Sequence, residues 1–264
     1  MIGFIGAGNM ATAIIKGICQ SGFLKGKEIT VFDTDGDKSR YLADTYGIKI
    51  AESSKALAQS CEKIVLAVKP NILPSVLKEI DGECKKKDTL LISVAAGKSI
   101  DFILSCLSFE GKIARIMPNI NALVGAAVSG CCVSERVTEA EKDFVKAFCE
   151  CYGTCVELDE KLFPIFSVIG GCSPAYTYMY IDALARAAVK NGMPKKQALE
   201  VAAQAVLGSA KTILSSSEHP WELVDRVCSP GGTTIEGVAS LQKNGFEAAV
   251  ISAAEESLKK DKSM

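Results

Sequence analysis

The chain begins with a short apolar run that leads directly into a glycine-rich turn. Residues 2–5 read Ile-Gly-Phe-Ile, and Gly6, Gly8 and Ala11 follow with the spacing G-x-G-x-x-A before a helical pattern. Gly6 permits a tight turn, Gly8 lets a pyrophosphate approach the backbone, and Ala11 keeps helix and strand close. The helix start then offers free amides to the phosphates. The pattern predicts a dinucleotide site, although the same glycines can also form a purely structural turn.

A second strand-like run supports the dinucleotide interpretation. Residues 29–32 read Ile-Thr-Val-Phe and end at Asp33, roughly 20 residues beyond the glycine turn. An acidic side chain at this place accepts a hydrogen bond from a ribose 2′-hydroxyl and repels a 2′-phosphate. We therefore expect NADH or NADPH as the cofactor, with Asp33 favouring NADH. Lys38 and Arg40 are close enough in sequence to soften the repulsion.

Further apolar runs predict a doubly wound sheet of the Rossmann type. They span residues 63–68, 89–94 and 112–117, and the segments between them are long enough for helices. Two more strands are expected at 126–133 and 154–158, with a helix at about 138–151 between them, so that the dinucleotide-binding domain covers residues 1–160. Sites in such sheets form at the carboxyl ends of the strands. This places the segments 69–70, 95–97 and 118–119 beside the cofactor, unless they are ordinary strand-to-helix turns.

Composition excludes several other classes of protein. The charge is balanced, with 30 Lys and Arg against 31 Asp and Glu and no long block of one sign, so no nucleic-acid partner is expected. No run of 18 residues lacks charges or turn formers, so no membrane span is expected either. The first residues do not resemble a secretion signal, which favours the cytoplasm.

The cysteines and the histidine do not suggest a metal site. Eleven cysteines are present, but Cys149, Cys151 and Cys155 lack paired C-x-x-C spacing and His219 is the only histidine. We expect reduced, mostly buried thiols and no bound metal. Since one histidine leaves little scope for histidine bases, a cofactor should carry any reaction.

The second half, residues 161–264, reads as an all-helical domain. Ser173 and Pro174 start a helix that Gly192 closes, and its apolar residues cover nearly every face. Further helices are expected at about 195–215, from Pro220 to about Val227, and again around residues 235–241. About 100 residues of helix cannot easily bury the first one alone, so we predict a symmetric dimer. Packing of this helix against the chain's own sheet domain is the alternative.

A run of small residues, Ser229-Pro230-Gly231-Gly232-Thr233-Thr234, enters one of these helices. Several free backbone amides at a helix start suit a carboxylate as readily as a phosphate. A capped turn between helices has the same pattern, and spacing alone does not decide between the two.

With these residues in view, the chain resembles the pyrroline-5-carboxylate reductase family over essentially its whole length. The most specific segment is 229–235, and 67–70, 93–97, 117–119 and 173–176 also match, as do His219-Pro220 and Gly245-Phe246. The resemblance implies reduction of 1-pyrroline-5-carboxylate to L-proline, the last step of proline biosynthesis, by hydride transfer from NADH or NADPH. It also implies a Rossmann domain followed by a helical dimerisation domain, and a substrate pocket completed across a homodimer or higher oligomer.

The resemblance implies a role for individual residues in each half of the chain. The loop before Thr234 would hold the substrate carboxylate through its backbone, while the Thr234 hydroxyl would bond the ring nitrogen as the catalytic contact. The implied substrate-binding residues are Asn119, Ser229, Gly231, Gly232, Thr233 and Thr234. The expected cofactor-binding residues are Ile5, Gly6, Ala7, Gly8, Asn9, Met10, Ala11, Asp33, Ser54, Ala67, Val68, Lys69, Pro70, Ser93, Val94, Ala95 and Ala96.

Two departures from the family pattern put substrate range and rate in doubt. Ile120-Asn121 stands where the family commonly has Thr-Pro, and Cys172 stands within the usual Gly-Ser-Gly-Pro-Ala-Tyr segment. Two other interpretations remain open. A reductase of similar build acting on hydroxy acids usually needs a lysine early in the helix after the sheet domain, whereas Lys190 lies at its far end. A nucleotide-binding regulatory protein without catalysis is the other.

Overall fold

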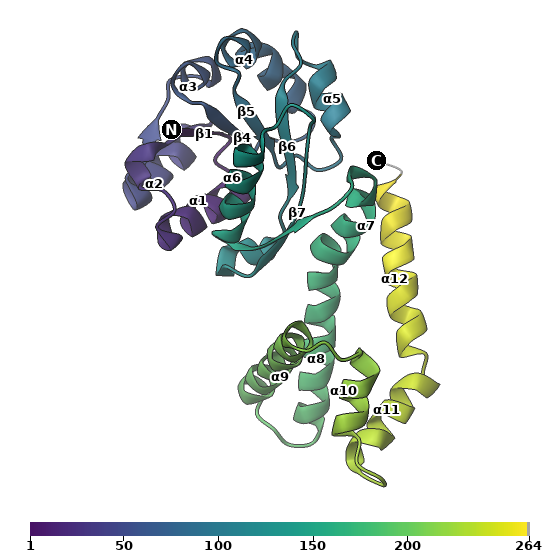
Figure 1. The fold of residues 1–264 in the computed structure, drawn as a ribbon. Coiled ribbons are helices and arrows are strands. Elements are labelled where there is room, and N and C mark those ends of the chain that lie inside the picture. Colours follow the sequence, from purple (N-terminus) through teal and green to yellow (C-terminus); the bar gives the residue numbers. More distant parts are fainter. Residues whose placement is uncertain (263–264) are drawn as a thin grey trace. The chain divides into compact units, whose positions relative to one another are not determined.

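The computed structural model describes residues 1–262, which form two compact units (Figure 1). The first unit runs from Met1 to Gly171, and the second begins at Cys172. The division therefore falls at the start of the long helix that the sequence predicts from Ser173.

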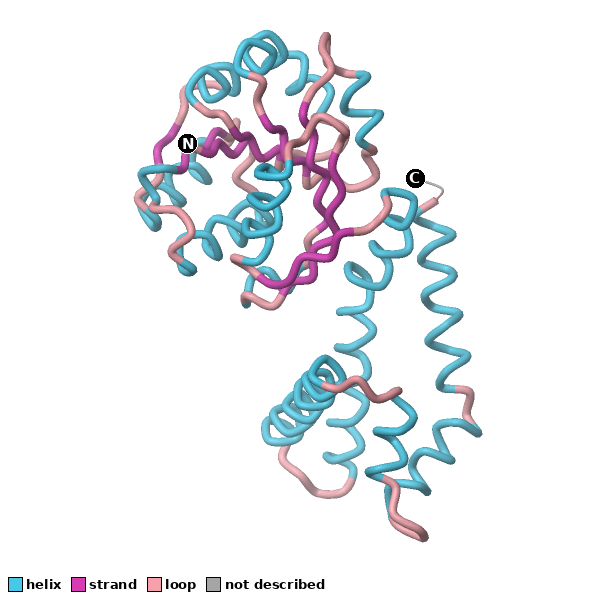
Figure 2. The backbone as a smooth tube through the Cα atoms, viewed as in Figure 1, coloured by secondary structure: helices cyan, strands magenta, loops and turns pink. Residues whose placement is uncertain are grey.

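An eight-stranded sheet forms the centre of the first unit (Figure 2). Its strands are β1 (Ile2–Ile5), β2 (Ile29–Phe32), β3 (Lys49–Ile50), β4 (Lys63–Leu66), β5 (Leu90–Ser93), β6 (Lys112–Met117), β7 (Ala127–Val133) and β8 (Gly153–Glu157). They lie in the order β3-β2-β1-β4-β5-β6-β7-β8. Because the order reverses on either side of β1, the carboxyl ends of β1 and β4 form the switch point at which such sheets bind dinucleotides.

The sheet differs from the predicted one at two places, which are one antiparallel pair of strands and one additional short strand. Strands β6 and β7 are antiparallel, whereas the other neighbouring pairs are parallel. Only a 3₁₀ turn (Ile120–Val124) connects them, and a parallel crossover needs a dozen or more residues. The sequence does not indicate β3, because its two exposed residues carry no alternating pattern.

Helices cover both faces of the sheet, as the doubly wound fold requires. They are α1 (Asn9–Ser21), α2 (Gly36–Tyr46), α3 (Ser54–Ser60), α4 (Leu73–Lys87), α5 (Ile100–Ser105), α6 (Glu139–Glu150) and the single turn α7 (Phe163–Phe166). Buried side chains of α1, α2 and α6 share one hydrophobic cluster, and those of α3, α4 and α5 share another. The two clusters lie on opposite faces, so the predicted Rossmann-type layering is confirmed.

The second unit consists of helices throughout its described part. They are α8 (Ser173–Lys190), α9 (Lys195–Ser215), α10 (Pro220–Val227), α11 (Thr233–Lys243) and α12 (Phe246–Asp261). A small cluster of Ala185, Ala198 and Ala202 joins α8 to α9. Tyr176 in α8 reaches α12, where its hydroxyl lies 2.5 Å from the hydroxyl of Ser257. The sequence predicts the first four of these helices; it did not give α12 as an element.

Large apolar side chains of this unit remain exposed in the single chain. In α8 only Pro174 and Ala185 are buried, whereas Met179 is 73% exposed. In α9, Leu214 is 87% exposed. A helix that is apolar on nearly every face therefore finds little cover within one chain, which agrees with the predicted need for a partner.

Candidate functional site

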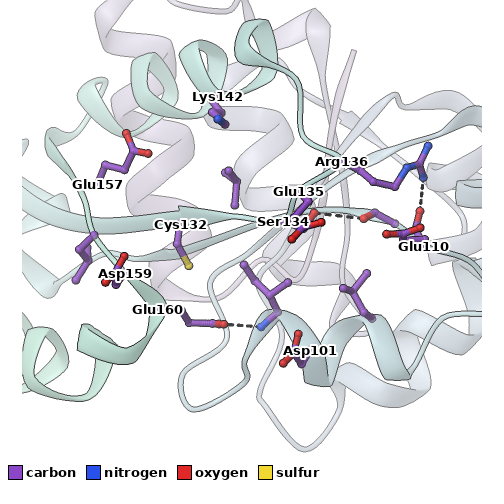
Figure 3. Close-up of a pocket in the computed structure, with 15 residues that line it drawn as sticks. Asp101, Glu110, Cys132, Ser134, Glu135, Arg136, Lys142, Glu157, Asp159 and Glu160 are labelled. Carbon is purple, nitrogen blue, oxygen red and sulfur yellow. Dashed lines mark hydrogen bonds between the residues drawn. The ribbon is translucent and has the colours of Figure 1, made fainter.

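A cavity of about 670 Å³ lies beside α5 and the ends of β7 and β8, but no predicted site residue lines it (Figure 3). Charged groups on its wall already have protein partners. Glu160 accepts hydrogen bonds from the Ile100 amide and from Arg115, both at 2.8 Å, and Arg136 pairs with Asp88 at 3.1 Å. These interactions stabilise the residues around the cavity and leave the charged groups involved in them paired. We therefore place the functional site elsewhere.

The glycine turn is built as its spacing predicts. Gly6 has φ +104°, and a Cβ there would lie 2.5 Å from the carbonyl oxygen of Ala67. Its amide donates to the carbonyl of Phe32 at 2.8 Å. Only glycine combines this backbone conformation with so close an approach. The turn therefore joins the ends of β1, β2 and β4 at one point.

Gly8 stands at the N-cap of α1 and opens onto free space. A Cβ built on Gly8 meets no atom within 4 Å, in contrast to Gly6. Because Gly8 has no side chain to cap the helix, the amides of Asn9, Met10 and Ala11 are left for a ligand. A pyrophosphate fits such a cradle through backbone N–H groups and the helix dipole. The residues present therefore suit the phosphates of a dinucleotide.

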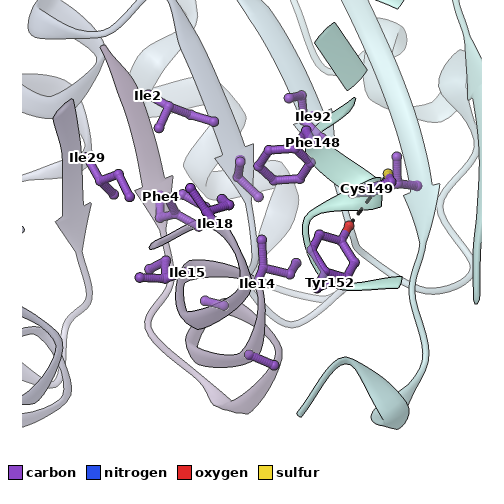
Figure 4. Close-up of a cluster of buried hydrophobic side chains, with 14 of the residues drawn as sticks. Ile2, Phe4, Ile14, Ile15, Ile18, Ile29, Ile92, Phe148, Cys149 and Tyr152 are labelled. Atoms are coloured by element: carbon purple, nitrogen blue, oxygen red, sulfur yellow. Dashed lines mark hydrogen bonds between the residues drawn. The ribbon is translucent and has the colours of Figure 1, made fainter. Parts of the chain in front are cut away.

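The helix behind this cradle is firmly anchored in the core (Figure 4). Ile14, Ile15 and Ile18 of α1 are fully buried. Burial of side chains of this size contributes about 1.5–3 kcal/mol each. Gly17 lets α1 approach the residues after α6, since a Cβ there would lie 2.6 Å from the Cβ of Tyr152. The packing of α1 in the core thus fixes the position of its first turn, where the free amides lie.

Asp33 lies at the end of β2, where its carboxylate braces the glycine turn. One oxygen accepts the Ala7 amide at 2.7 Å, and the other accepts the Asp35 amide at 2.8 Å. The sequence predicts Asp33 as a ribose ligand and gives no signal of this second contact. Asp33 is half-buried, so its exposed part remains open to a ligand.

The carboxyl ends of β4 and β5 lie beside the turn through backbone pairing. Ala67 donates to the carbonyl of Ile5 at 2.8 Å, and Val94 donates to the carbonyl of Leu66 at 3.2 Å. Ser93 is buried and its hydroxyl accepts from the Ala95 amide at 3.3 Å. The predicted segment 67–70 thus follows β4, which is next to β1, and the segment 93–96 lies at the end of β5, the strand beyond β4. Ser54 is buried at the start of α3, and its neighbour Ser53 caps that helix.

Asn119 is a buried residue whose side-chain amide makes two hydrogen bonds to the backbone. Its amide nitrogen donates to the carbonyl of Gly170 at 2.8 Å, and its amide oxygen accepts from the Val128 amide at 3.3 Å. Both contacts lie within the first unit. The side chain ties β6 to β7 and to the segment before α8, which is a structural role that the sequence did not indicate.

In the second unit, the loop before α11 forms another uncapped helix start. Gly232 is the N-cap, its amide donates to the Ser229 carbonyl at 3.0 Å, and Gly231 has φ +66°. A Cβ on Gly232 would lie 2.3 Å from the Ser229 hydroxyl oxygen, so a side chain there would displace that hydroxyl. Thr233 and Thr234 are exposed in the first turn of α11. Free backbone amides at such a helix start can bind an anion, and the Thr234 hydroxyl lies in the same turn.

His219 is part of a helix cap. Its Nδ1 accepts the Trp221 amide at 3.2 Å, and Glu222 accepts the His219 amide at 3.0 Å. The sole histidine therefore starts α10. No group of three or more His, Cys, Asp or Glu within residues 1–262 is arranged to hold a metal ion. In the same range, no helix is both long and apolar enough to cross a membrane.

The Rossmann-type sheet and its uncapped glycine turn define a nicotinamide-dependent oxidoreductase. Residues 1–97 match the family model "NADP oxidoreductase coenzyme F420-dependent", and residues 160–264 match "Pyrroline-5-carboxylate reductase dimerisation". The chain is 43% identical over 263 residues to the pyrroline-5-carboxylate reductase of Escherichia coli K12, covering 100% of this chain and 97% of that protein. The chain belongs to the pyrroline-5-carboxylate reductase family.

Solved structures agree with this assignment over the full length. The Plasmodium falciparum pyrroline carboxylate reductase with NADP bound is 32% identical, with a TM-score of 0.87 and coverage of 99% of this chain and 97% of that chain. The Coxiella burnetii pyrroline-5-carboxylate reductase is 28% identical, with a TM-score of 0.94 and the same coverage. The predicted family, fold class and nicotinamide cofactor are confirmed, and the helical unit is an oligomerisation domain.

Proposed function

We propose that the chain carries out the reaction that names its family, the reduction of 1-pyrroline-5-carboxylate to L-proline. The observation that carries this proposal is the loop 229–234, an anion cradle next to the Thr234 hydroxyl, in a chain that also has the glycine turn. The substrate offers a carboxylate and a ring nitrogen close together, and the cradle and hydroxyl offer partners for both.

The first half binds the cofactor and the second half binds the substrate. Residues 1–160 act as the dinucleotide-binding domain, and residues 161–264 act in dimerisation and substrate binding. The amides at the start of α1 hold the pyrophosphate, and Asp33, Ser54 and the segments 67–70 and 93–96 surround the rest of the cofactor. Asn119 takes part in substrate binding, and its bonds to Gly170 and Val128 fix the position of its side chain.

In this reaction the main role of the protein is to position the substrate and the cofactor relative to each other. A bound reduced nicotinamide supplies a hydride for the imine carbon. The backbone amides from Gly231 to Thr234 fix the carboxylate, and the Thr234 hydroxyl bonds the ring nitrogen as the imine becomes an amine. The helical unit of a second copy completes the substrate pocket, which explains why the loop is open to solvent in one chain.

Oxidation of reduced cofactor on addition of pyrroline-5-carboxylate tests this function. We expect a steady, substrate-dependent loss of nicotinamide absorbance at 340 nm. Gly8→Asp is the matched control, because a side chain at Gly8 meets no protein atom but places a carboxylate where the phosphates bind. This variant should fold normally and lose cofactor binding. A wild-type chain that binds cofactor without turnover would contradict the proposal and favour a regulatory protein.

We further propose a preference for NADH, because Asp33 accepts a ribose hydroxyl and repels a 2′-phosphate. Asp33→Ala should raise the ratio of kcat/KM for NADPH to that for NADH. Since Asp33 also holds the Ala7 amide, both values should fall together to some degree, and the ratio removes that common effect. A large NADPH advantage in the wild type that persists in Asp33→Ala would show that Asp33 does not discriminate.

A further inference from the structure

Three cysteines that the proposed reaction does not use converge near the edge of the sheet. Cys131 lies in β7, Cys155 in β8 and Cys149 in the last turn of α6. In the parallel pair of β7 and β8, Ser129 is opposite Cys155 and Cys131 is opposite Glu157. Because side chains alternate along a strand, Cys131 and Cys155 share one face of the sheet, the face that α6 covers. Cys155 packs against the buried cluster that contains Cys131 and Cys149.

These contacts give Cys155 a different electrostatic setting from the other buried cysteines. The neighbouring thiols of Cys131 and Cys149, together with the nearby Lys146 ammonium, hold the pKa of Cys155 well below that of an ordinary thiol. The proximity of Cys155, together with burial, raises the pKa of Cys131 and Cys149. The cluster therefore stabilises one thiolate, on Cys155, with two thiols beside it.

Small molecules can reach this thiolate. A cavity of about 290 Å³ lies over this cluster. It is lined by Cys131, Cys132 and Val133 of β7, by Cys155 and Glu157 of β8, and by Glu139, Lys142, Asp143 and Lys146 of α6. Cys155 is half-buried, whereas Cys149 is fully buried and accepts a hydrogen bond from the Tyr152 hydroxyl at 3.5 Å. An accessible thiolate with further thiols in contact is the arrangement found in oxidant-sensitive cysteines.

We propose that Cys155 is an oxidant-reactive thiol that reacts with small peroxides. Its thiolate attacks one peroxide oxygen, so that an S–O bond forms, the O–O bond breaks and the leaving hydroxide takes a proton to become water. The sulfur loses two electrons and becomes a sulfenic acid, and the peroxide is reduced. A flanking thiol then attacks this sulfur, so that an S–S bond forms, the S–O bond breaks and water leaves with the thiol proton.

The test treats the full-length native chain with hydrogen peroxide and measures the loss of each free thiol. After removal of peroxide, the protein is unfolded and alkylated, and fragment ions distinguish Cys149, Cys151 and Cys155 in their shared peptide. At pH 7 an ordinary thiol is only a few per cent thiolate. Cys155 should therefore lose its free thiol roughly tenfold faster than the half-buried Cys106 and Cys228, after allowing for its lower intrinsic nucleophilicity. Dithiothreitol should restore it.

Two adjacent residues of β7 provide a matched pair of variants. Cys131→Ala removes one of the two thiols that flank Cys155 and should slow its oxidation severalfold at pH 6. Cys132 also borders the cavity, but its side chain packs against the hydrophobic cluster on the opposite face of the sheet, so Cys132→Ala should leave the rate unchanged. Equal rates for Cys155, Cys106 and Cys228 in the wild type would overturn the proposal even if a variant failed to fold. Equal slowing by Cys131→Ala and Cys132→Ala would overturn it as well.

Discussion

Thr234 is the residue on which the proposed chemistry depends most. It lies in the first turn of α11, but Gly232 rather than Thr234 is the N-cap, and no side chain caps this helix. A capping role would make Thr234 important for stability alone. The structure instead leaves the cap to the backbone and the Thr234 side chain exposed, as a substrate contact requires.

Replacement of Thr234 by valine separates the two roles. Thr234→Val keeps the branched shape and removes the hydroxyl, so it removes a hydrogen bond to a group that acquires or carries charge. Such a bond contributes roughly 1.5–3 kcal/mol, and each 1.36 kcal/mol of barrier is about tenfold in rate. We expect kcat/KM to fall on the order of ten- to a hundredfold, with cofactor affinity and melting temperature nearly unchanged. Normal turnover in a less stable protein would remove Thr234 from the mechanism.

At the scale of residues, the sequence indicates backbone requirements better than side-chain contacts. Gly6 and Gly8 were predictable because a tight turn and an open approach each demand glycine at fixed spacing. The contacts of Asn119 and Asp33 were not, since each depends on a partner far along the chain. Gly170 pairs with Asn119, and Ala7 pairs with Asp33. Spacing within one motif carries no information on such pairs.

At the scale of elements, Lys112 links three parts of the first unit. It starts β6 and forms ion pairs with Asp88, before β5, at 2.8 Å and with Glu141, in α6, at 3.1 Å. The bond from Lys112 lowers the pKa of Asp88. Burial acts to raise the pKa of Glu141, but hydrogen bonds from Thr138 and Lys112 outweigh it and lower that pKa. The pKa of Lys112 is raised by the same two carboxylates.

These shifts predict how the stability contribution of Lys112 depends on pH. The carboxylates have lowered pKa values, so their contribution is present above about pH 4, where they ionise in the unfolded chain, and is lost as pH falls further. Lys112→Met should cost about 1–2 kcal/mol at pH 7. That corresponds to a few degrees of melting temperature, and the difference from wild type should shrink at pH 3.

Lys142→Met is the control for this prediction. Lys142 pairs with Glu139 at 2.6 Å, but that pair is within one helix and Glu139 is 84% exposed. Surface pairs of this kind contribute little, so the melting temperature should barely change at either pH. Equal losses for the two variants, or a Lys112→Met loss that is the same at pH 3 and pH 7, would contradict the assigned role of the network.

Element boundaries followed from the sequence where capping or periodicity is strong. Pro220 and Val227 bound α10 in both the prediction and the structure. The direction of β7 was harder to predict, because it depends on the length of the connection after β6 rather than on the residues of either strand. The helix α12 lacks a distinct starting signal other than Gly245, which has φ +74°.

At the scale of the whole molecule, the second unit lacks a core large enough for its apolar surface. Its buried cluster consists of three alanines, whereas Tyr178, Met179, Leu207 and Leu214 are all more than 40% exposed. Oligomerisation through this unit supplies the missing cover. The sequence predicts oligomerisation from one helix that has no polar face. Such a helix must be covered by other apolar groups, however the remaining helices are arranged.

We therefore expect an obligate dimer or larger assembly, with no folded monomer at micromolar concentration in sedimentation experiments. Met179→Lys places a charge on an exposed apolar position of α8. It should lower the molecular mass of the assembly measured by sedimentation, and it should lower the melting temperature. Full burial of a methionine contributes about 1.5–3 kcal/mol. Because a two-fold interface contains this residue from both subunits, the substitution removes the contribution twice. Gln197→Lys, at an exposed polar position of α9, adds the same charge and should change neither quantity. A well-folded, active wild-type monomer would contradict the prediction, since the exposed side chains of α8 would then need no partner.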